Sequence, residues 1–154
     1  MHWVARGLLC GAVATFPMTI VILVGRKVAG FRTPPPVEIA HRISRRAGIP
    51  RPRSEGGFRL FWLAAHIGYG AGCGMLYVLV RRWLPSHPAP AGLIAGGAVW
   101  GVSYLGYLPL LSLYPAPEDD APDRTLVMIA AHAVYGLALA ETERRVRYLA
   151  PERP

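Results

Sequence analysis

The chain has 154 residues, of which 53% are hydrophobic and 17% are charged, and its formal net charge is +8 at pH 7. This length fits about one domain. A soluble helical bundle would carry charged residues every few positions on its outward faces, whereas here the charges are clustered and four long stretches have none. The basic residues lie beside these stretches, where they meet lipid headgroups, so the charge excess indicates a membrane surface and not nucleic acid.

Each uncharged stretch predicts a helix that crosses a membrane. Roughly 20 apolar residues span about 30 Å of hydrocarbon, and a charge at the centre costs about 2.5 to 3.5 kcal/mol on insertion scales. The fourth stretch is the shortest, so its helix is predicted to continue past Glu141. We therefore expect one membrane domain over residues 1–154, an all-α polytopic four-helix bundle with spans at about 7–25, 60–80, 91–114 and 125–143.

The first span is expected to be a retained helix and not a cleaved signal peptide. Its apolar stretch exceeds the usual length of about 7 to 15 residues, and it contains Pro17. The basic loop 26–59 follows, and in it Val37, Ala40 and Ile43 share a helical stripe with arginines to the side. This pattern predicts an amphipathic helix on the membrane surface over 37–47, with an irregular basic loop as the alternative.

A short motif occurs twice in the chain. Residues 64–70 read Ala-Ala-His-Ile-Gly-Tyr-Gly, and residues 130–136 read Ala-Ala-His-Ala-Val-Tyr-Gly. The motif falls in the second and fourth spans, which predicts two copies of a helical hairpin. Because a hairpin contains an even number of spans, both copies enter the membrane from the same side, and the repeats are expected to be parallel.

Small residues indicate where the helices pack, because membrane helices associate by close van der Waals approach. His66, Gly70 and Gly74 fall on one face of the second span, as His132 and Gly136 do in the fourth. Both histidines are therefore expected to point into the bundle. The first and third spans are expected to pack through small-xxx-small pairs, namely Gly7 with Gly11 and Gly97 with Gly101.

The second half of the chain resembles the YagU-like family of small bacterial inner-membrane proteins. The resemblance is carried by the run 92–96, by Pro109 before two leucines, by His132, and by Glu141 followed by Arg144 and Arg145. It implies a four-helix protein of the bacterial inner membrane with both termini in the cytoplasm. The basic residues of the loop 26–59 would then have to cross the membrane, so charge alone does not fix the orientation.

The two histidines are the candidate residues for a chemical function, and three hypotheses fit them. They can hydrogen-bond to neighbouring helices and fix the packing. They can line a polar path for a proton, an ion or a small solute. They can also ligate haem as a bis-histidine pair, His66 with His132. Candidate members of the path or of the packing are His66, Tyr69, His132, Tyr135 and Glu141, and further polar groups are Thr15, Thr19, Ser103, Tyr104 and Tyr107.

The sequence contains no glycine-rich phosphate loop, nucleophile elbow or paired carboxylates, so we do not expect an enzyme. Cys10 and Cys73 have no paired spacing, so no metal site and no resident cofactor are expected. The leading prediction is a structural or partner-binding protein, with a homodimer or another membrane protein as the partner. The alternative is a small transporter or channel.

Overall fold

The computed structural model describes residues 2–50 and 54–149, and the described part of the chain is built from helices without strands. Four long apolar segments run over Trp3–Ala29, Glu55–Trp83, Pro88–Leu110 and Pro122–Leu149, and each is long and apolar enough to cross a membrane. They form an all-α four-helix bundle, which confirms the predicted fold class. The helix ends lie beyond the predicted ends, except that the third stops at Leu110 and not at residue 114.

The helices begin and end where side chains satisfy their free backbone groups. Helix α1 (Trp3–Ala29) is capped by His2, whose ring accepts a hydrogen bond from the Val4 N–H, and it ends at Gly30 with φ of 72°. Helix α3 (Glu55–Val80) is capped by Ser54, which accepts from the Gly57 N–H at 3.1 Å. Without such partners the first N–H groups of a helix have no intrahelical acceptor.

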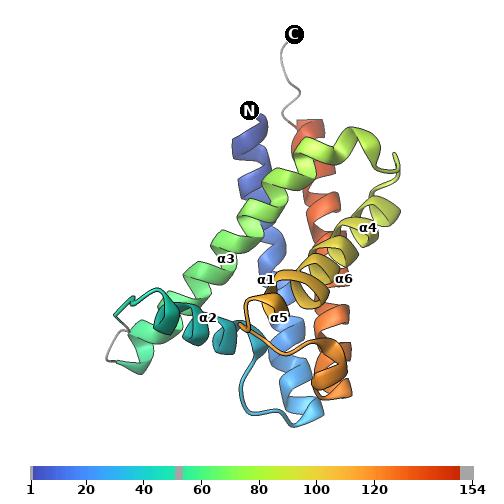
Figure 1. Cartoon of the computed structure of the whole chain (residues 1–154). Coiled ribbons are helices and arrows are strands. Elements are labelled where there is room, and N and C mark those ends of the chain that lie inside the picture. The colour runs from blue at the N-terminus through green and yellow to red at the C-terminus, as the bar shows by residue number, and fades with distance from the viewer. Residues whose placement is uncertain (1, 51–53, 150–154) are drawn as a thin grey trace.

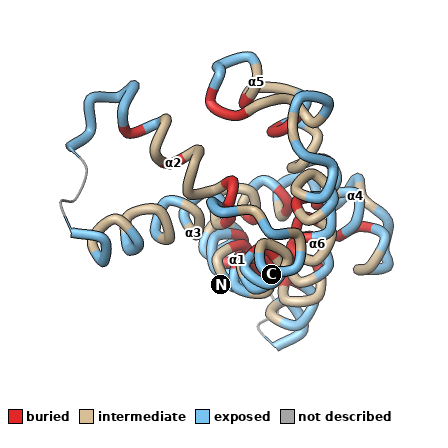
Figure 2. Tube along the Cα trace, turned by 90° about the horizontal axis from the view of Figure 1, so that it is seen from below, coloured by how far each residue is buried: buried red, intermediate tan, exposed pale blue. Residues whose placement is uncertain are grey.

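Helices α1 and α6 (Pro122–Leu149) form the centre of the bundle (Figures 1 and 2). Helix α1 packs on α3 and on α6, whereas α4 (Pro88–Gly101) packs on α6. The order of packing is therefore α3, α1, α6, α4. Helices α3 and α4 diverge and make few contacts with each other, so the bundle is closed between α1 and α6 and open between α3 and α4 (Figure 1).

Glycines let α1 and α3 approach closely. A Cβ atom added to Gly7 would lie 2.9 Å from the Gly74 carbonyl oxygen, and one added to Gly11 would lie 2.9 Å from the Gly74 Cα. A Cβ on Gly70 would overlap the Thr15 hydroxyl, which itself donates to the Gly11 carbonyl at 2.9 Å. Four glycines of this pair of helices therefore lie at one backbone-to-backbone contact.

The contact between α4 and α6 uses other glycines than we expected. Gly92 and Gly96 lie against Gly136 and the His132 backbone, so that a Cβ on Gly136 would come within 2.8 Å of the Gly96 nitrogen. Gly97 and Gly101 have no atom within 4 Å of an added Cβ. The predicted packing pair Gly97 with Gly101 is therefore wrong, because the rotation of α4 turns that face away from α6.

The third span ends early because its last turns are wound differently. Segment η2 (Val102–Tyr107) is a widened, π-type turn that is kinked at Gly106, whose φ of -113° and ψ of -109° are not helical, and the Leu108 N–H donates to the Ser103 carbonyl five residues before it. Pro109 has no N–H for the Leu105 carbonyl, and a proline at this spacing favours a widened turn. The short helix α5 (Leu108–Leu110) follows, and the chain then turns at Ser112, whose φ is 48°.

Helix α2 (Pro35–Arg46) is amphipathic, but it begins two residues before the predicted helix, with prolines in its first turn. Its apolar residues Pro36, Ile39, Ala40 and Ile43 face a pocket of the bundle. Its arginines reach the turn after α5, since Arg46 donates to the Leu111 carbonyl and Arg42 to the Ser112 carbonyl. Helix α2 thus packs between α3 and this turn, and its position on the membrane surface stays a prediction.

Ion pairs connect α2 to the start of α6. Glu38 lies 2.7 Å from Arg42 and 3.9 Å from Arg124. Arg124 also pairs with Asp120, and the Tyr114 hydroxyl donates to Asp120 at 2.9 Å. Burial and the neighbouring Asp120 carboxylate raise the pKa of Tyr114 well above its ordinary value, so the hydroxyl keeps the proton that it donates.

Large apolar side chains cover the outside of the four long helices. Phe16, Ile20, Leu105 and Leu126 are all more than half exposed. In water this much exposed apolar surface would be unfavourable, whereas in a bilayer lipid chains cover it. Together with the four apolar helices, this surface makes the chain a multi-pass membrane protein.

Candidate functional site

A pocket of about 160 Å³ lies where α3 and α4 diverge. Its walls come from every long helix and from α2, and most of them are apolar. His66, Tyr69 and Cys73 line it from α3, Ser103 and Tyr107 line it from η2, and Thr15, His132 and Tyr135 line its inner wall. The structure thus brings both histidines and both tyrosines of the duplicated motif to one pocket.

A chain of hydroxyl groups connects the two diverging helices. Tyr107 donates to the Tyr69 hydroxyl at 3.0 Å, and Ser103 donates to the Val99 carbonyl at 2.6 Å. The hydroxyls of Tyr69 and Ser103 are 3.0 Å apart. Since the Ser103 proton already goes to Val99, Tyr69 must be the donor to Ser103. Ser103 and Tyr107 are four residues apart and therefore lie on the same side of η2, and this places both hydroxyls beside Tyr69.

His132 lies at the inner wall with one of its ring nitrogens engaged. Its Nδ1 lies 2.7 Å from the Met128 carbonyl oxygen. A carbonyl only accepts, so Nδ1 carries the proton, and in the neutral ring Nε2 has a free lone pair. The ring is held edge to face by Tyr104, with 5.8 Å between centroids. His132 therefore offers an acceptor in a fixed orientation.

The other copy of the motif lies in a different environment. The Nε2 atom of His66 is buried without a hydrogen-bond partner. Tyr69 is 45% exposed and bonds to η2, whereas Tyr135 is buried and donates to the Gly70 carbonyl at 2.6 Å. The difference follows from the packing, because α6 has two long helices beside it and α3 has one. The copy on α6 is thus anchored, and the copy on α3 borders the opening.

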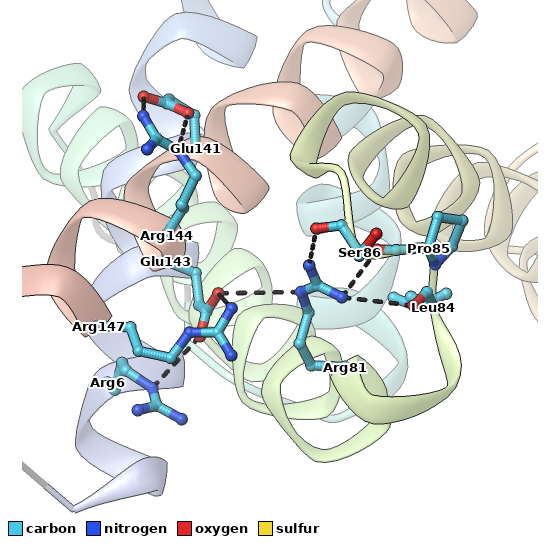
Figure 3. Close-up of polar contacts among 9 residues, drawn as sticks. All are labelled: Arg6, Arg81, Leu84, Pro85, Ser86, Glu141, Glu143, Arg144 and Arg147. Atoms are coloured by element: carbon cyan, nitrogen blue, oxygen red, sulfur yellow. Dashed lines mark hydrogen bonds and ion pairs between the residues drawn. The ribbon is translucent and has the colours of Figure 1, made fainter. Parts of the chain in front are cut away.

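Glu141 does not contribute to this pocket. It lies at the opposite end of the bundle, where its side chain is turned outward and pairs with Arg144 at 2.7 Å (Figure 3). It also pairs with Arg145 at 2.7 Å. The expectation that Glu141 belongs to a polar path is therefore wrong. The buried face of α6 contains positions 132, 136, 139 and 143. Position 141 is not on that face.

Glu143 is the buried carboxylate at that end, and its side chain is 1% exposed. Three guanidinium groups surround it (Figure 3), those of Arg6 at 3.6 Å, Arg81 at 4.0 Å and Arg147 at 3.5 Å. Arg81 also donates to the carbonyls of Pro85 and Ser86. This cluster joins the start of α1, the end of α3 and the end of α6, and its role is to hold the helix ends together.

Sequence reasoning did not find Glu143, although its spacing of four, seven and eleven residues from Leu139, Gly136 and His132 places it on the inward face of α6. It also did not place the residues of α2 at the pocket. No local signal shows that a loop helix packs against a distant turn. Among the described residues, no group of three or more His, Cys, Asp or Glu side chains is placed to hold a metal ion.

Comparisons with known proteins add no relative. No family model matches the chain, and searches of curated proteins and of solved structures find no similar chain. The resemblance to the YagU-like family therefore stays a prediction. Haem ligation by His66 and His132 also stays a prediction, and a Soret band in protein purified after haem-replete expression is the observation that it requires.

Proposed function

We propose that this protein is a binding protein of the bacterial inner membrane and not an enzyme, and that its partner is an amphiphile that enters the pocket from the bilayer. The observation that carries this proposal is the pocket between α3 and α4, where the bundle is open. An alkyl chain can run outward between the two helices, while the polar group of the same molecule meets the histidines and hydroxyls.

The composition of the pocket supports a ligand of this kind. Ligand sites are mostly apolar and contain a few placed polar groups. Here Met18, Ile39, Leu108 and Met128 supply apolar surface, and the polar groups described above lie among them. An amphiphile is a different partner from the second copy or membrane protein that the sequence led us to expect. Binding to a second copy or to another membrane protein stays a prediction.

Binding fits the position of the pocket better than transport does. The pocket occupies the half of the bundle nearer α2, and its lining residues reach only as far as Thr15, Cys73 and Tyr135. A path across the membrane would have to continue past Tyr77 and the Glu143 cluster, which are buried among α1, α3 and α6. A flux of protons, ions or small solutes through liposomes carrying the protein is the result that would favour the transporter hypothesis.

The proposed location rests on the helical architecture and on the family resemblance. Bacterial outer-membrane proteins span as β-barrels, so a helical bundle fits the inner membrane. The end of the bundle that carries both termini has arginines directly beside the spans, at positions 6, 81, 82, 144, 145 and 147. The opposite end carries ten Arg and Lys residues, so charge does not decide the orientation, and we place the termini in the cytoplasm on the family resemblance.

Blocking the pocket tests the proposal. The substitution Ala65→Phe puts a ring among the lining residues, and Ala64→Phe puts the same ring on the neighbouring exposed position outside the pocket. Three probes, dodecanol, dodecyl methyl ether and dodecanoate, are added to each protein in phosphatidylcholine nanodiscs. We expect at least one probe to raise the thermal unfolding midpoint of the wild type and of Ala64→Phe by several degrees, because a ligand of the folded state stabilises it.

The Ala65→Phe protein should show no such rise, since the ring occupies the space for the ligand. Ala64→Phe controls for effects of the probes on the bilayer, which are equal for both variants. If all three proteins responded equally to every probe, or if none responded, the pocket would not be a binding site for amphiphiles.

A further inference from the structure

We infer that the polar group of the ligand is an uncharged hydrogen-bond donor, so that the pocket takes a lipid alcohol and not a fatty acid or an ether. This inference rests on the proposed function and names the class of molecule that the same pocket binds. It follows from the charge of the lining residues and from the direction of their hydrogen bonds.

The first step concerns charge. None of the described residues that line the pocket is Asp, Glu, Lys or Arg. An ionised group of a ligand would lose its water there without gaining an opposite charge, and burial of an unpaired charge is strongly unfavourable. A carboxylate or a phosphate is therefore a poor ligand unless one of the histidines becomes protonated, and the comparison with dodecanoate below tests that case.

The second step concerns the hydroxyl groups of the lining. The hydrogen bonds of the chain run from Tyr107 to Tyr69, from Tyr69 to Ser103 and from Ser103 to the Val99 carbonyl, so the protons of all three hydroxyls are used within the protein. Thr15 donates to the Gly11 carbonyl and Tyr135 to the Gly70 carbonyl. These five hydroxyls cannot donate to a ligand without losing a bond that they already make. The neutral His66 ring carries one N–H, and it can donate to the oxygen of a ligand that itself donates elsewhere in the pocket.

The third step concerns acceptors. The Nε2 lone pair of His132 is available because its Nδ1–H donates to the Met128 carbonyl. The single proton of the Tyr107 hydroxyl points towards Tyr69 at 3.0 Å, with Ser103 as a more distant second acceptor at 3.3 Å, so the lone pairs of the Tyr107 oxygen are also available. An alcohol hydroxyl donates to one of these acceptors and can accept from another group at the same time, whereas an ether oxygen only accepts.

The three dodecyl probes test this inference in wild-type protein, in the same nanodiscs and with Ala65→Phe as the blank. We expect dodecanol to bind about three- to tenfold more tightly than dodecyl methyl ether, which corresponds to one ordinary hydrogen bond. Dodecanoate should bind more weakly than both. The substitution His132→Phe removes the buried acceptor of the two and should lower the ratio of alcohol to ether affinity.

The outcomes separate this inference from the proposed function. Equal affinity for the alcohol and the ether, or the tightest binding by dodecanoate, would overturn the assignment of a donor ligand while a pocket that Ala65→Phe blocks would remain. If Ala65→Phe changed nothing for any probe, the proposed function itself would fail. If His132→Phe does not fold, the ratio of dodecanol affinity to dodecyl methyl ether affinity in the wild type still tests whether the ligand is a donor, because that measurement needs no variant.

Discussion

The substitution Gly136→Leu is expected to destabilise the bundle by about 3 kcal/mol or more. A side chain at this position meets the Gly92 carbonyl and lies within 2.8 Å of the Gly96 nitrogen, and backbone atoms cannot turn aside as a side chain can. Overpacking of a well-packed contact typically costs about 1 to 3 kcal/mol, and helices α4 and α6 would have to separate here. Denaturation by SDS in mixed micelles, followed by circular dichroism, measures the free energy of unfolding.

Gly97→Leu is the matched control for this variant. It makes the same chemical change on α4, one residue after Gly96, where an added Cβ has no atom within 4 Å. Both variants gain the same helix propensity, so the difference between their free energies of unfolding reports the contact between the helices. We expect Gly97→Leu to unfold at the wild-type SDS concentration or above it. Equal losses of stability in the two variants would show that α4 does not face α6 through Gly92 and Gly96.

The second large effect is expected for Glu143→Gln, which should cost about 3 kcal/mol in the free energy of unfolding. The change keeps the shape of the side chain but removes the negative charge at which Arg6, Arg81 and Arg147 converge. Removing one partner of a buried ion pair is strongly destabilising, because the remaining charge stays in a place of low polarity. The same denaturation experiment measures it.

Glu141→Gln provides the comparison two residues away. Glu141 also pairs with two arginines, Arg144 and Arg145, but its side chain is turned outward and solvent screens the pair. We expect no measurable change in stability for this variant. The opposite order, with Glu141→Gln the more harmful change, would contradict the position of Glu143 inside the bundle.

The membrane character and the number of helices could be predicted because they depend on average properties. Four uncharged stretches are enough to predict four spans, whatever the helices pack against. The side of a helix that faces a neighbour depends on its rotation, which single residues do not reveal. Helix α4 has two small-residue pairs offset by five residues, Gly92 with Gly96 and Gly97 with Gly101, and only the contact with α6 distinguishes them.

The pocket could be predicted only in part for the same reason. The duplicated motif singles out His66, Tyr69, His132 and Tyr135, and the structure places all four at the pocket. Their different hydrogen bonds follow from the opening between α3 and α4, and nothing in two identical motifs indicates which copy borders it. A helical projection places Ser103 and Tyr107 on one face, four residues apart, but it does not show that this face meets Tyr69 of α3.

Photo-crosslinking tests most directly whether a ligand enters between α3 and α4. A dodecanol derivative with a diazirine in its alkyl chain is activated in nanodiscs, with and without an excess of plain dodecanol, and the modified residues are identified by mass spectrometry. We expect competition to remove adducts from pocket residues such as Ala65, Tyr69 and Tyr107, and to leave adducts on outward residues such as Phe16 and Ile20. Adducts that competition reduces equally everywhere, or nowhere, would contradict a ligand site between these helices.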